Sequence, residues 1–298
     1  MSTTNPDHKA EQPLRVAIQG EAGCFHDSAA REYFRERGRA IDIVECETFQ
    51  DLADAMTADA SLLGIMAIEN TIAGSILPNH ELIRRTNVRV VGEHKVRISH
   101  CLCALPGETI ADITEVNSHP MALMQCEQFL RRYPSMRMVE KNDTAGSARE
   151  IAARRLSGHA SVCSPYAAGL YGLSVLADGI ETNKHNFTRF LLLADPLIAR
   201  ELAPPSAQAD KASLVFSLPH THGALSKVLT ILSFYDVNLT KIQSTPIVGR
   251  EWEYRFYVDL TFDDPVRYHQ AITAITPLLN DFRELGLYTE APSPAIGN

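Results

Sequence analysis

The sequence predicts an α/β fold with mainly parallel strands, followed by a smaller domain of a different type. From Arg15 onward, short apolar runs alternate with amphipathic stretches, which is typical of strands that alternate with helices. The chain has 298 residues, and at about 100–200 residues per domain this length predicts two or three domains. Residues 195–210 contain Ala203-Pro204-Pro205-Ser206-Ala207, a composition that predicts a linker between the two parts.

In the α/β region, the expected strands are the short apolar runs and the expected helices are the amphipathic stretches between them. The runs that predict strands are residues 15–19, 41–45, 62–68, 88–93, 97–105, 113–117, 136–140, 160–163 and 189–193. The stretches that predict helices are residues 27–37, 49–58, 77–85, 121–132, 145–155 and 166–171.

Beyond the linker, the order of the expected elements changes. The elements are strand 212–218, helix 224–235, strand 238–248, a turn at Gly249-Arg250, strand 252–262, helix 266–285 and a short final strand. This βαββαβ order predicts a ferredoxin-like domain of about 80 residues.

Several expected strand-to-helix turns carry small or polar residues where a helix would begin. They are Gly20/Gly23, residues 70–75, Ser118-His119-Pro120, Asp143-Thr144 and Ser164-Pro165. Free backbone N–H groups at helix starts, together with hydroxyls, are suited to bind a carboxylate or a phosphate. Each turn taken alone is explained by ordinary helix capping. Together on one α/β framework, they predict an anion-binding cleft at the carboxyl ends of the strands.

The sequence does not predict a cofactor or a metal site. Gly20-Glu-Ala-Gly23 is an incomplete dinucleotide fingerprint, because His26 stands where its third glycine would be. The six cysteines lack the spacing of zinc and redox motifs, and we expect them to be buried thiols. They stand at positions 24, 46, 101, 103, 126 and 163.

Charge and hydropathy exclude two classes of partner. The chain has 28 Lys plus Arg against 36 Asp plus Glu, a formal net charge of −8 with neutral His, and no basic cluster. Nucleic acid is therefore a poor partner, since phosphate binding needs a dense basic surface. No run of about 18 apolar residues or secretory signal stands out, so we expect a soluble, cytoplasmic protein with no membrane partner.

An ordered set of short motifs makes the chain similar to a known family. In the α/β region they are Gly20-Glu-Ala-Gly-Cys-Phe25-His, Ile68-Glu69-Asn70-Thr71-Ile-Ala-Gly74-Ser75, Ser118-His119-Pro120 with Gln125-Cys126, Asn142-Asp143-Thr144-Ala145, and Asn186-Phe187-Thr188-Arg189-Phe190. In the tail they are Gly223-Ala224-Leu225 and Asn238–Pro246. Over about residues 14–290 the chain resembles prephenate dehydratase with a C-terminal ACT domain.

The resemblance implies a catalytic region of two α/β lobes, arranged like a periplasmic binding protein with the active site in the cleft between them. One lobe would comprise residues 14–93 with the returning segment 179–195, and the other residues 95–178. The implied units are the prephenate dehydratase catalytic domain at 14–195, the linker at 196–210 and the ACT regulatory domain at 211–290.

The reaction that the resemblance implies is the conversion of prephenate to phenylpyruvate with loss of CO2 and water, in L-phenylalanine biosynthesis. Such an enzyme is a carbon–oxygen lyase. Aromatisation of the ring supplies the driving force, so neither a metal nor another cofactor is required. Two alternatives stay open: arogenate, the aminated analogue, as the substrate, or a non-catalytic protein that binds carboxylates or senses an amino acid.

Thr188 matches the family's essential threonine, so the resemblance assigns its hydroxyl to the departing hydroxyl of the substrate. An alcohol is a poor proton donor near neutral pH, and we therefore expect a polarising hydrogen bond or a relay through water. Asn70, Ser118 and Gln125 match other family positions associated with activity. Their amide and hydroxyl groups suit the orientation of carboxylates and of the leaving group.

Six further residues are expected to contact the substrate. They are Arg189, Phe190, Thr71, Ser75, His119 and Thr144. For Arg189, a bidentate contact with a carboxylate competes with an alternative in which the side chain points away and braces the strand. For His119, a proton relay competes with a structural hydrogen bond at its turn.

The tail departs more from the family pattern than the catalytic region does. Gln243-Ser244-Thr245-Pro246 stands where the family usually has Glu-Ser-Arg-Pro, and Ser226 replaces an apolar residue. The resemblance implies L-phenylalanine as a feedback effector and a homodimer or homotetramer through the ACT domains. An oligomerisation module without an effector is the alternative. The expected effector contacts are Gly223, Ala224, Leu225, Asn238, Leu239, Gln243 and Ser244.

Overall fold

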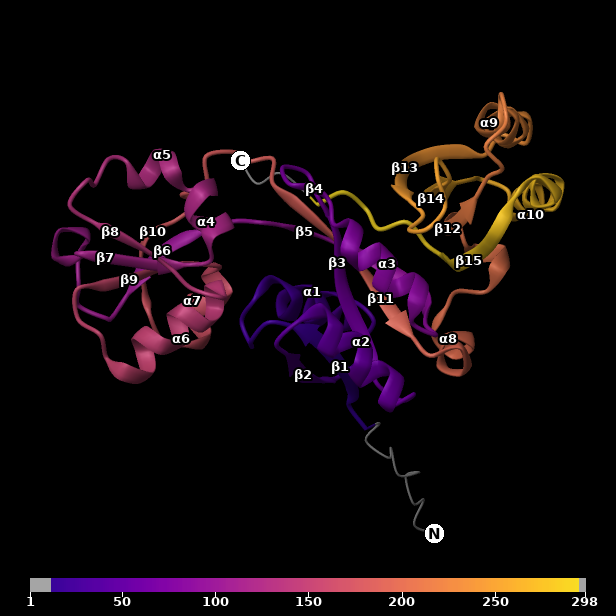
Figure 1. Ribbon diagram of the computed structural model, residues 1–298. Helices are drawn as coiled ribbons and strands as arrows, with labels where there is room; N and C mark the ends of the chain where they lie inside the picture. Colours follow the sequence, from indigo (N-terminus) through magenta and orange to yellow (C-terminus); the bar gives the residue numbers. More distant parts are fainter. Residues whose placement is uncertain (1–11, 295–298) are drawn as a thin grey trace, which may run out of the picture.

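The computed structural model describes residues 12–294, whose strands form three sheets (Figure 1). The first sheet lies between the second sheet and the C-terminal sheet, and helices pack against all three. Within residues 12–294, no helix is both long and apolar enough to cross a membrane. The fold class expected from the sequence, α/β lobes followed by a small antiparallel domain, is confirmed.

The first sheet is mixed, although mainly parallel strands were expected. Its order is β2-β1-β3-β11-β5, with β4 paired to β3. The strands are β1 (Leu14–Gln19), β2 (Ile41–Cys46), β3 (Leu63–Asn70), β4 (Gly74–Ser75), β5 (Arg89–Arg97) and β11 (Phe187–Ala194). The helices are α1 (Phe25–Arg35), α2 (Phe49–Ala58) and α3 (Leu77–Arg85). Because β5 leaves toward the second lobe and β11 returns beside it, β11 runs antiparallel to both β3 and β5.

The second sheet has the order β10-β6-β9-β7-β8. Its strands are β6 (Cys101–Ala104), β7 (Glu115–Ser118), β8 (Arg137–Glu140), β9 (His159–Cys163) and β10 (Ser174–Ala177). Its helices are α4 (Pro120–Gln125), α5 (Glu127–Leu130), α6 (Thr144–Arg154) and α7 (Pro165–Leu170), with a 3₁₀ turn at Ile110–Asp112. The single helix expected over 121–132 is two helices, because the backbone of Cys126 (φ −102°, ψ 10°) leaves helical geometry.

The C-terminal sheet is antiparallel, with the order β13-β14-β12-β15. Its elements are β12 (Lys211–Ser217), α9 (Ala224–Phe234), β13 (Asn238–Pro246), β14 (Tyr254–Thr261), α10 (Pro265–Ile275), a 3₁₀ turn (Thr276–Leu278) and β15 (Asn280–Tyr288). The expected helix 266–285 was too long: α10 stops before Pro277, which lacks the N–H that a continuing helix needs. The segment expected as a linker contains α8 (Pro196–Leu202) and a 3₁₀ turn at Ser206–Gln208.

The C-terminal sheet buries both of its faces within the chain. One face packs on α9 and α10, around residues such as Leu214 and Val258. The other face packs on the first lobe, since Val215 and Leu285 belong to the same buried cluster as Leu193 of β11. The domain is therefore tied to the strand that carries Thr188.

Gly286 in β15 permits the closest part of this packing. A Cβ atom at position 286 would lie 2.0 Å from the carbonyl oxygen of Val90 in β5. Only glycine lets the two backbones approach so closely, so this position fixes how β15 sits on β5.

Candidate active site

A cavity of about 280 Å³ lies between the first two lobes. This is near the lower end of the 300–1,000 Å³ or so that is usual for small-molecule sites. Six residues expected at the site line it: Asn70, His119, Gln125, Thr144, Thr188 and Phe190. The structure thus gathers residues that are up to about 120 positions apart in the sequence. Four larger surface hollows, of about 680, 570, 430 and 410 Å³, contain none of the expected catalytic residues.

Thr188 stands at the start of β11 and is largely buried. Its Oγ1 accepts a hydrogen bond from Asn70 Nδ2 at 3.0 Å. Asn70 ends β3, and its Oδ1 accepts hydrogen bonds from the backbone N–H groups of Ile72 and Ala73, both at 2.9 Å. The turn after β3 therefore holds the amide that faces the Thr188 hydroxyl.

Gln125 reaches the same place from the second lobe. It ends α4, and its Oε1 accepts hydrogen bonds from Asn186 Nδ2 at 3.0 Å and His100 Nε2 at 3.1 Å. Asn186 Oδ1 in turn accepts from Asn70 Nδ2 at 2.7 Å. Amide groups thus connect the two lobes beside the cavity.

Two cavity residues from the second lobe stand at helix starts. His119 is the N-cap of α4, and its Nδ1 accepts a hydrogen bond from the backbone N–H of Met121 at 3.2 Å. This is the structural hydrogen bond at the turn that was one of the two alternatives for His119. Thr144 is the first residue of α6. Its neighbour Asp143 caps that helix by accepting from the Gly146 N–H at 2.7 Å, and burial raises the pKa of the Asp143 carboxyl.

The cavity wall on the side of the first lobe is aromatic. The Phe190 and His26 rings pack edge to face with centroids 5.0 Å apart, and His26 also packs against Phe49. Burial lowers the pKa of His26 to about 4, and its Nε2 accepts from the Ala67 N–H at 3.3 Å. His26 is therefore neutral near pH 7 and offers a flat surface rather than a charge.

Three expected residues do not bring their side chains to the cavity. The Ser118 hydroxyl is fully buried and donates to the carbonyl of Val162 in β9 at 2.6 Å. The Thr71 hydroxyl donates to the carbonyl of His185 at 3.0 Å, which ties the turn after β3 to the segment before β11. Ser75 lies in β4 and is not among the residues that line the cavity, although its neighbours Ala73 and Ile76 are.

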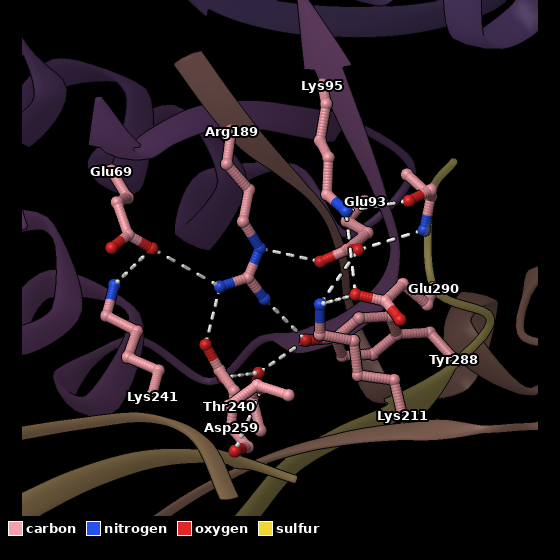
Figure 2. A network of polar contacts seen from close by, with 12 residues as sticks. Glu69, Glu93, Lys95, Arg189, Lys211, Thr240, Lys241, Asp259, Tyr288 and Glu290 are labelled. Carbon is pink, nitrogen blue, oxygen red and sulfur yellow. Dashed lines mark hydrogen bonds and ion pairs between the residues drawn. The ribbon is translucent and has the colours of Figure 1, made fainter. Parts of the chain in front are cut away.

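Arg189 is the clearest departure from the expected site (Figure 2). Arg189 is not among the residues that line the cavity, and its guanidinium lies in the interface with the C-terminal domain, where Nε lies 2.6 Å from Glu93 Oε2. Nη1 lies 2.5 Å from Asp259 Oδ2, and Nη2 donates to the Tyr288 hydroxyl at 2.9 Å. Side chains alternate along a strand, so the residue after Thr188 faces the opposite side of the sheet. This corrects the expectation of a substrate contact in favour of the bracing alternative.

More ion pairs extend this interface beyond Arg189. Lys211 lies 3.0 Å from Glu93 and 2.9 Å from Glu290, and Lys241 lies 3.2 Å from Glu69 (Figure 2). Each pair with Glu93 or Glu69 joins the first lobe to the C-terminal domain. The strand that carries Thr188 is thus connected to that domain by both charges and apolar packing.

Comparison with known proteins identifies the family to which the chain belongs. A family model described as prephenate dehydratase matches residues 16–196. The chain belongs to the prephenate dehydratase family. Members of this family are carbon–oxygen lyases of phenylalanine biosynthesis.

One relative of this chain is arogenate dehydratase/prephenate dehydratase 2 of Arabidopsis thaliana, a chloroplastic protein. The two are 38% identical over 256 residues, which is 83% of this chain but only 65% of the Arabidopsis protein. A solved prephenate dehydratase from Arthrobacter aurescens, in complex with L-Phe, has a TM-score of 0.80 at 27% identity, covering 93% of this chain and 90% of that one. A structure described as a quorum-quenching acylase has a TM-score of 0.81 at 28% identity, covering 93% and 98%.

The C-terminal domain of this chain is consistent with an ACT domain. Gly223 has a left-handed φ of 73° and is the N-cap of α9, which Ala224 and Leu225 begin. Asn238 and Leu239 begin β13, and Gln243 and Ser244 lie farther along it, at the edge of the sheet. The expected effector residues thus lie on one helix start and one edge strand.

All six cysteines are free and buried, as expected. Cys101 and Cys103 of β6 lie beside Cys163 of β9, with all three sulfurs within 4.8 Å of one another. Such a group of thiols could hold a soft metal ion. It lies inside the second lobe's sheet and does not line the cavity, so we assign it no part in the site.

Sequence reasoning missed His26, His100, Asp143 and Asn186 as site residues. Asn186 and Asp143 stand inside motifs that carried the resemblance, so their position was the available signal. His26 also stands in such a motif, at the end of Gly20-Glu-Ala-Gly-Cys-Phe25-His, whereas His100 had no comparable signal, because its role depends on Gln125, 25 positions away.

Proposed function

We propose that this protein catalyses the decarboxylating dehydration of prephenate to phenylpyruvate. The observation that carries the proposal is the hydrogen bond from Asn70 Nδ2 to Thr188 Oγ1. Because Thr188 Oγ1 accepts this bond, its own proton is available to a group in the cavity. The family membership of the chain supports the same reaction.

In the proposed reaction, the bond between the ring and its carboxylate breaks and CO2 departs. The electron pair from that bond enters the ring, and the bond to the ring hydroxyl breaks on the opposite carbon. The leaving hydroxide takes up one proton and departs as water. Thr188 donates a hydrogen bond to the departing oxygen, and the proton comes from solvent, since an alcohol has too high a pKa to supply it near pH 7.

Neutral donors hold the two carboxylates of the substrate in this proposal. Among the residues that line the cavity, none is a lysine or an arginine. Gln125, Thr144 and His119 offer amide, hydroxyl and imidazole groups at the cavity. Fixed dipoles of this kind stabilise charge well in a site from which water is excluded.

Arogenate is the second candidate substrate, and Asp143 favours it. Asp143 is an acidic residue that lines the cavity, and a carboxylate is a natural partner for the ammonium that distinguishes arogenate from prephenate. The Arabidopsis relative is named for both substrates.

The experiment is a comparison of kcat/KM on prephenate and on arogenate for the wild type and Asp143→Asn. We expect the wild type to prefer prephenate and the variant to lose activity on arogenate selectively. A wild type that prefers arogenate would replace the first candidate by the second.

Acylase activity, suggested by the name of one similar structure, has weaker support. Acyl transfer needs a nucleophile with a base beside it. The Thr188 hydroxyl faces an amide, which cannot take its proton, and the Ser118 hydroxyl is committed to a backbone carbonyl. We therefore do not propose it.

For the C-terminal domain, we propose an L-phenylalanine site and pairing between chains. The similar Arthrobacter structure is a complex with L-Phe. The large side chains of Phe234, Val248 and Trp252 are exposed at the end of α9 and at the turn between β13 and β14, as expected for a surface that a second chain covers. L-Phenylalanine added to the assay above should lower the rate, and an unchanged rate would remove this proposal.

A further inference from the structure

Asn186 and His100 complete a continuous chain of hydrogen bonds beside the cavity. The chain runs from Thr188 through Asn70, Asn186 and Gln125 to His100, with successive distances of 3.0, 2.7, 3.0 and 3.1 Å. It begins on strands of the first lobe and ends in the second. Asn186 is fully buried and His100 is 2% exposed, so the protein itself supplies these bonds.

The direction of the chain is set at Asn70. An amide side chain can face either way, but a backbone N–H only donates. Two such groups, from Ile72 and Ala73, point at one atom of the Asn70 side chain, which must therefore be the oxygen. The opposite end is the NH2 group, which donates to Asn186 Oδ1 and to Thr188 Oγ1, with the Phe187 carbonyl as a third, more distant acceptor at 3.2 Å.

The orientation of each amide fixes the orientation of the next one. Since Asn186 accepts from Asn70, its oxygen faces Asn70 and its NH2 group faces Gln125. The Gln125 atom that receives this bond must be Oε1, and His100 Nε2 faces that same oxygen. His100 must then carry its proton on Nε2, and Nδ1, which is buried without a partner, is the bare nitrogen of the ring.

We propose that Asn186 and His100 are positioning residues that lock this direction, so that Thr188 and Gln125 both present protons to the cavity. Two donors converge on Gln125 Oε1, which leaves Nε2 as the end of that amide available to a ligand. At the other end, Thr188 accepts from Asn70 and donates to the cavity. The inference rests on the proposed dehydratase function and adds the direction in which its two donors face.

Asn186→Asp tests the proposal, because it changes one donor into a titrating group of the same shape. The ionised carboxylate still accepts from Asn70 but repels Gln125 Oε1. When protonated, the carboxyl donates to Gln125 again. We expect kcat/KM to fall roughly 10- to 100-fold at pH 8, the usual effect of breaking one buried hydrogen bond. The loss should shrink as the pH is lowered toward 5, since burial raises the pKa of a carboxyl.

Other titrating groups near the chain are His100, His119, Asp143 and Glu181, whose Oε2 accepts from the His100 backbone N–H. These groups are present in the wild type too. The kcat/KM of the variant is therefore divided by the kcat/KM of the wild type at the same pH. Asn117→Asp is the matched control, because Asn117 is 3% exposed and lies outside the chain. Its kcat/KM relative to the wild type should stay close to 1 at every pH, because Asn117 neither lines the cavity nor belongs to the chain. A ratio for Asn186→Asp that stays flat would overturn the proposal.

A second measurement needs neither substrate nor a variant. The ¹⁵N chemical shifts of His100 in the wild-type protein report which ring nitrogen carries the proton. We expect the proton on Nε2, and a proton on Nδ1 would contradict the direction of the chain. If the wild type turns over no substrate, the dehydratase proposal fails while this result still decides the direction of the chain.

Discussion

The side chains that form the hydrogen-bond chain beside Thr188 are neutral amides, and the guanidinium of Arg189 is directed away from them. Asn70, Asn186 and Gln125 connect to one another, whereas Arg189 on the next position of β11 pairs with Glu93 and Asp259 on the far side of the sheet. A buried charge without a partner is costly, and amides avoid this cost while still donating hydrogen bonds.

Gln125→Glu should separate substrate binding from chemistry. The new carboxylate would still accept from Asn186 and His100 through one oxygen, but it would turn a negative oxygen toward the anionic substrate. We expect KM to rise roughly 10- to 100-fold, with kcat changing only a few-fold because the Thr188 hydroxyl keeps its orientation. Steady-state kinetics checks this, with Gln128→Glu on the exposed side of α5 as the control. A fall in kcat at constant KM would contradict it.

The sequence predicted which residue types gather at the cavity, but not the direction in which each side chain points. The set of motifs correctly placed Asn70, Gln125, Thr144 and Phe190 at one cavity with Thr188. It could not show where Arg189 points, because that depends on Asp259, which lies 70 positions away in another domain. It also could not show that the Ser118 hydroxyl turns to Val162, which becomes a neighbour only when β7 and β9 pair.

Among the elements, β5 and β11 connect all parts of the fold. Both belong to the first sheet, their far ends lead to the second lobe, and β15 of the C-terminal sheet packs across β5 (Figure 1). Most helices and strands were expected from periodicity alone. The helices expected too long, at 121–132 and 266–285, were stretches of mixed polar and apolar residues in which a break at Cys126 or Pro277 decides the outcome. The helix α8 and the strands β4 and β10 were not expected.

Gly286→Ala should loosen the contact between β15 and β5. The added Cβ would overlap the Val90 carbonyl, and a backbone oxygen can yield only if a strand shifts. We expect a loss of stability of about 1–3 kcal/mol, as for other overpacked sites. Thermal unfolding measures this, and Gly169→Ala, where an added Cβ meets no atom within 4 Å, is the control. Equal melting temperatures for the two variants would count against the proposed close approach.

At the scale of the whole molecule, buried ion pairs attach the C-terminal domain to the first lobe. Burial raises the pKa of the Asp259 carboxyl, but Arg189 outweighs burial and holds that pKa below its usual value. A carboxyl with a depressed folded-state pKa stabilises the fold above its unfolded pKa, about 4, and loses this effect as the pH falls through the folded value. The attachment of the domain should therefore be insensitive to pH near neutrality and weaken in acid.

Asp259→Asn should destabilise this attachment at neutral pH. Arg189 would keep Glu93 but lose its second carboxylate, and breaking one partner of a buried pair costs about 3–5 kcal/mol. We expect faster proteolysis within residues 195–210 and a smaller loss of stability between pH 6 and pH 3 than in the wild type. Asp263→Asn, on the exposed turn after β14, is the control. Unchanged proteolysis would show that apolar packing alone holds the domain.

The central claim is that the Thr188 hydroxyl assists departure of the substrate's hydroxyl, and Thr188→Val tests it most directly. The substitution keeps the shape of the side chain and replaces only the hydroxyl by a methyl group. Phenylpyruvate formed from prephenate is measured by its ultraviolet absorption, with Thr57→Val in α2 as the control. We predict a roughly 100- to 1,000-fold lower kcat for Thr188→Val, the usual effect of removing one donor to a developing charge, and an unchanged rate for the control. Full activity in Thr188→Val would contradict the account.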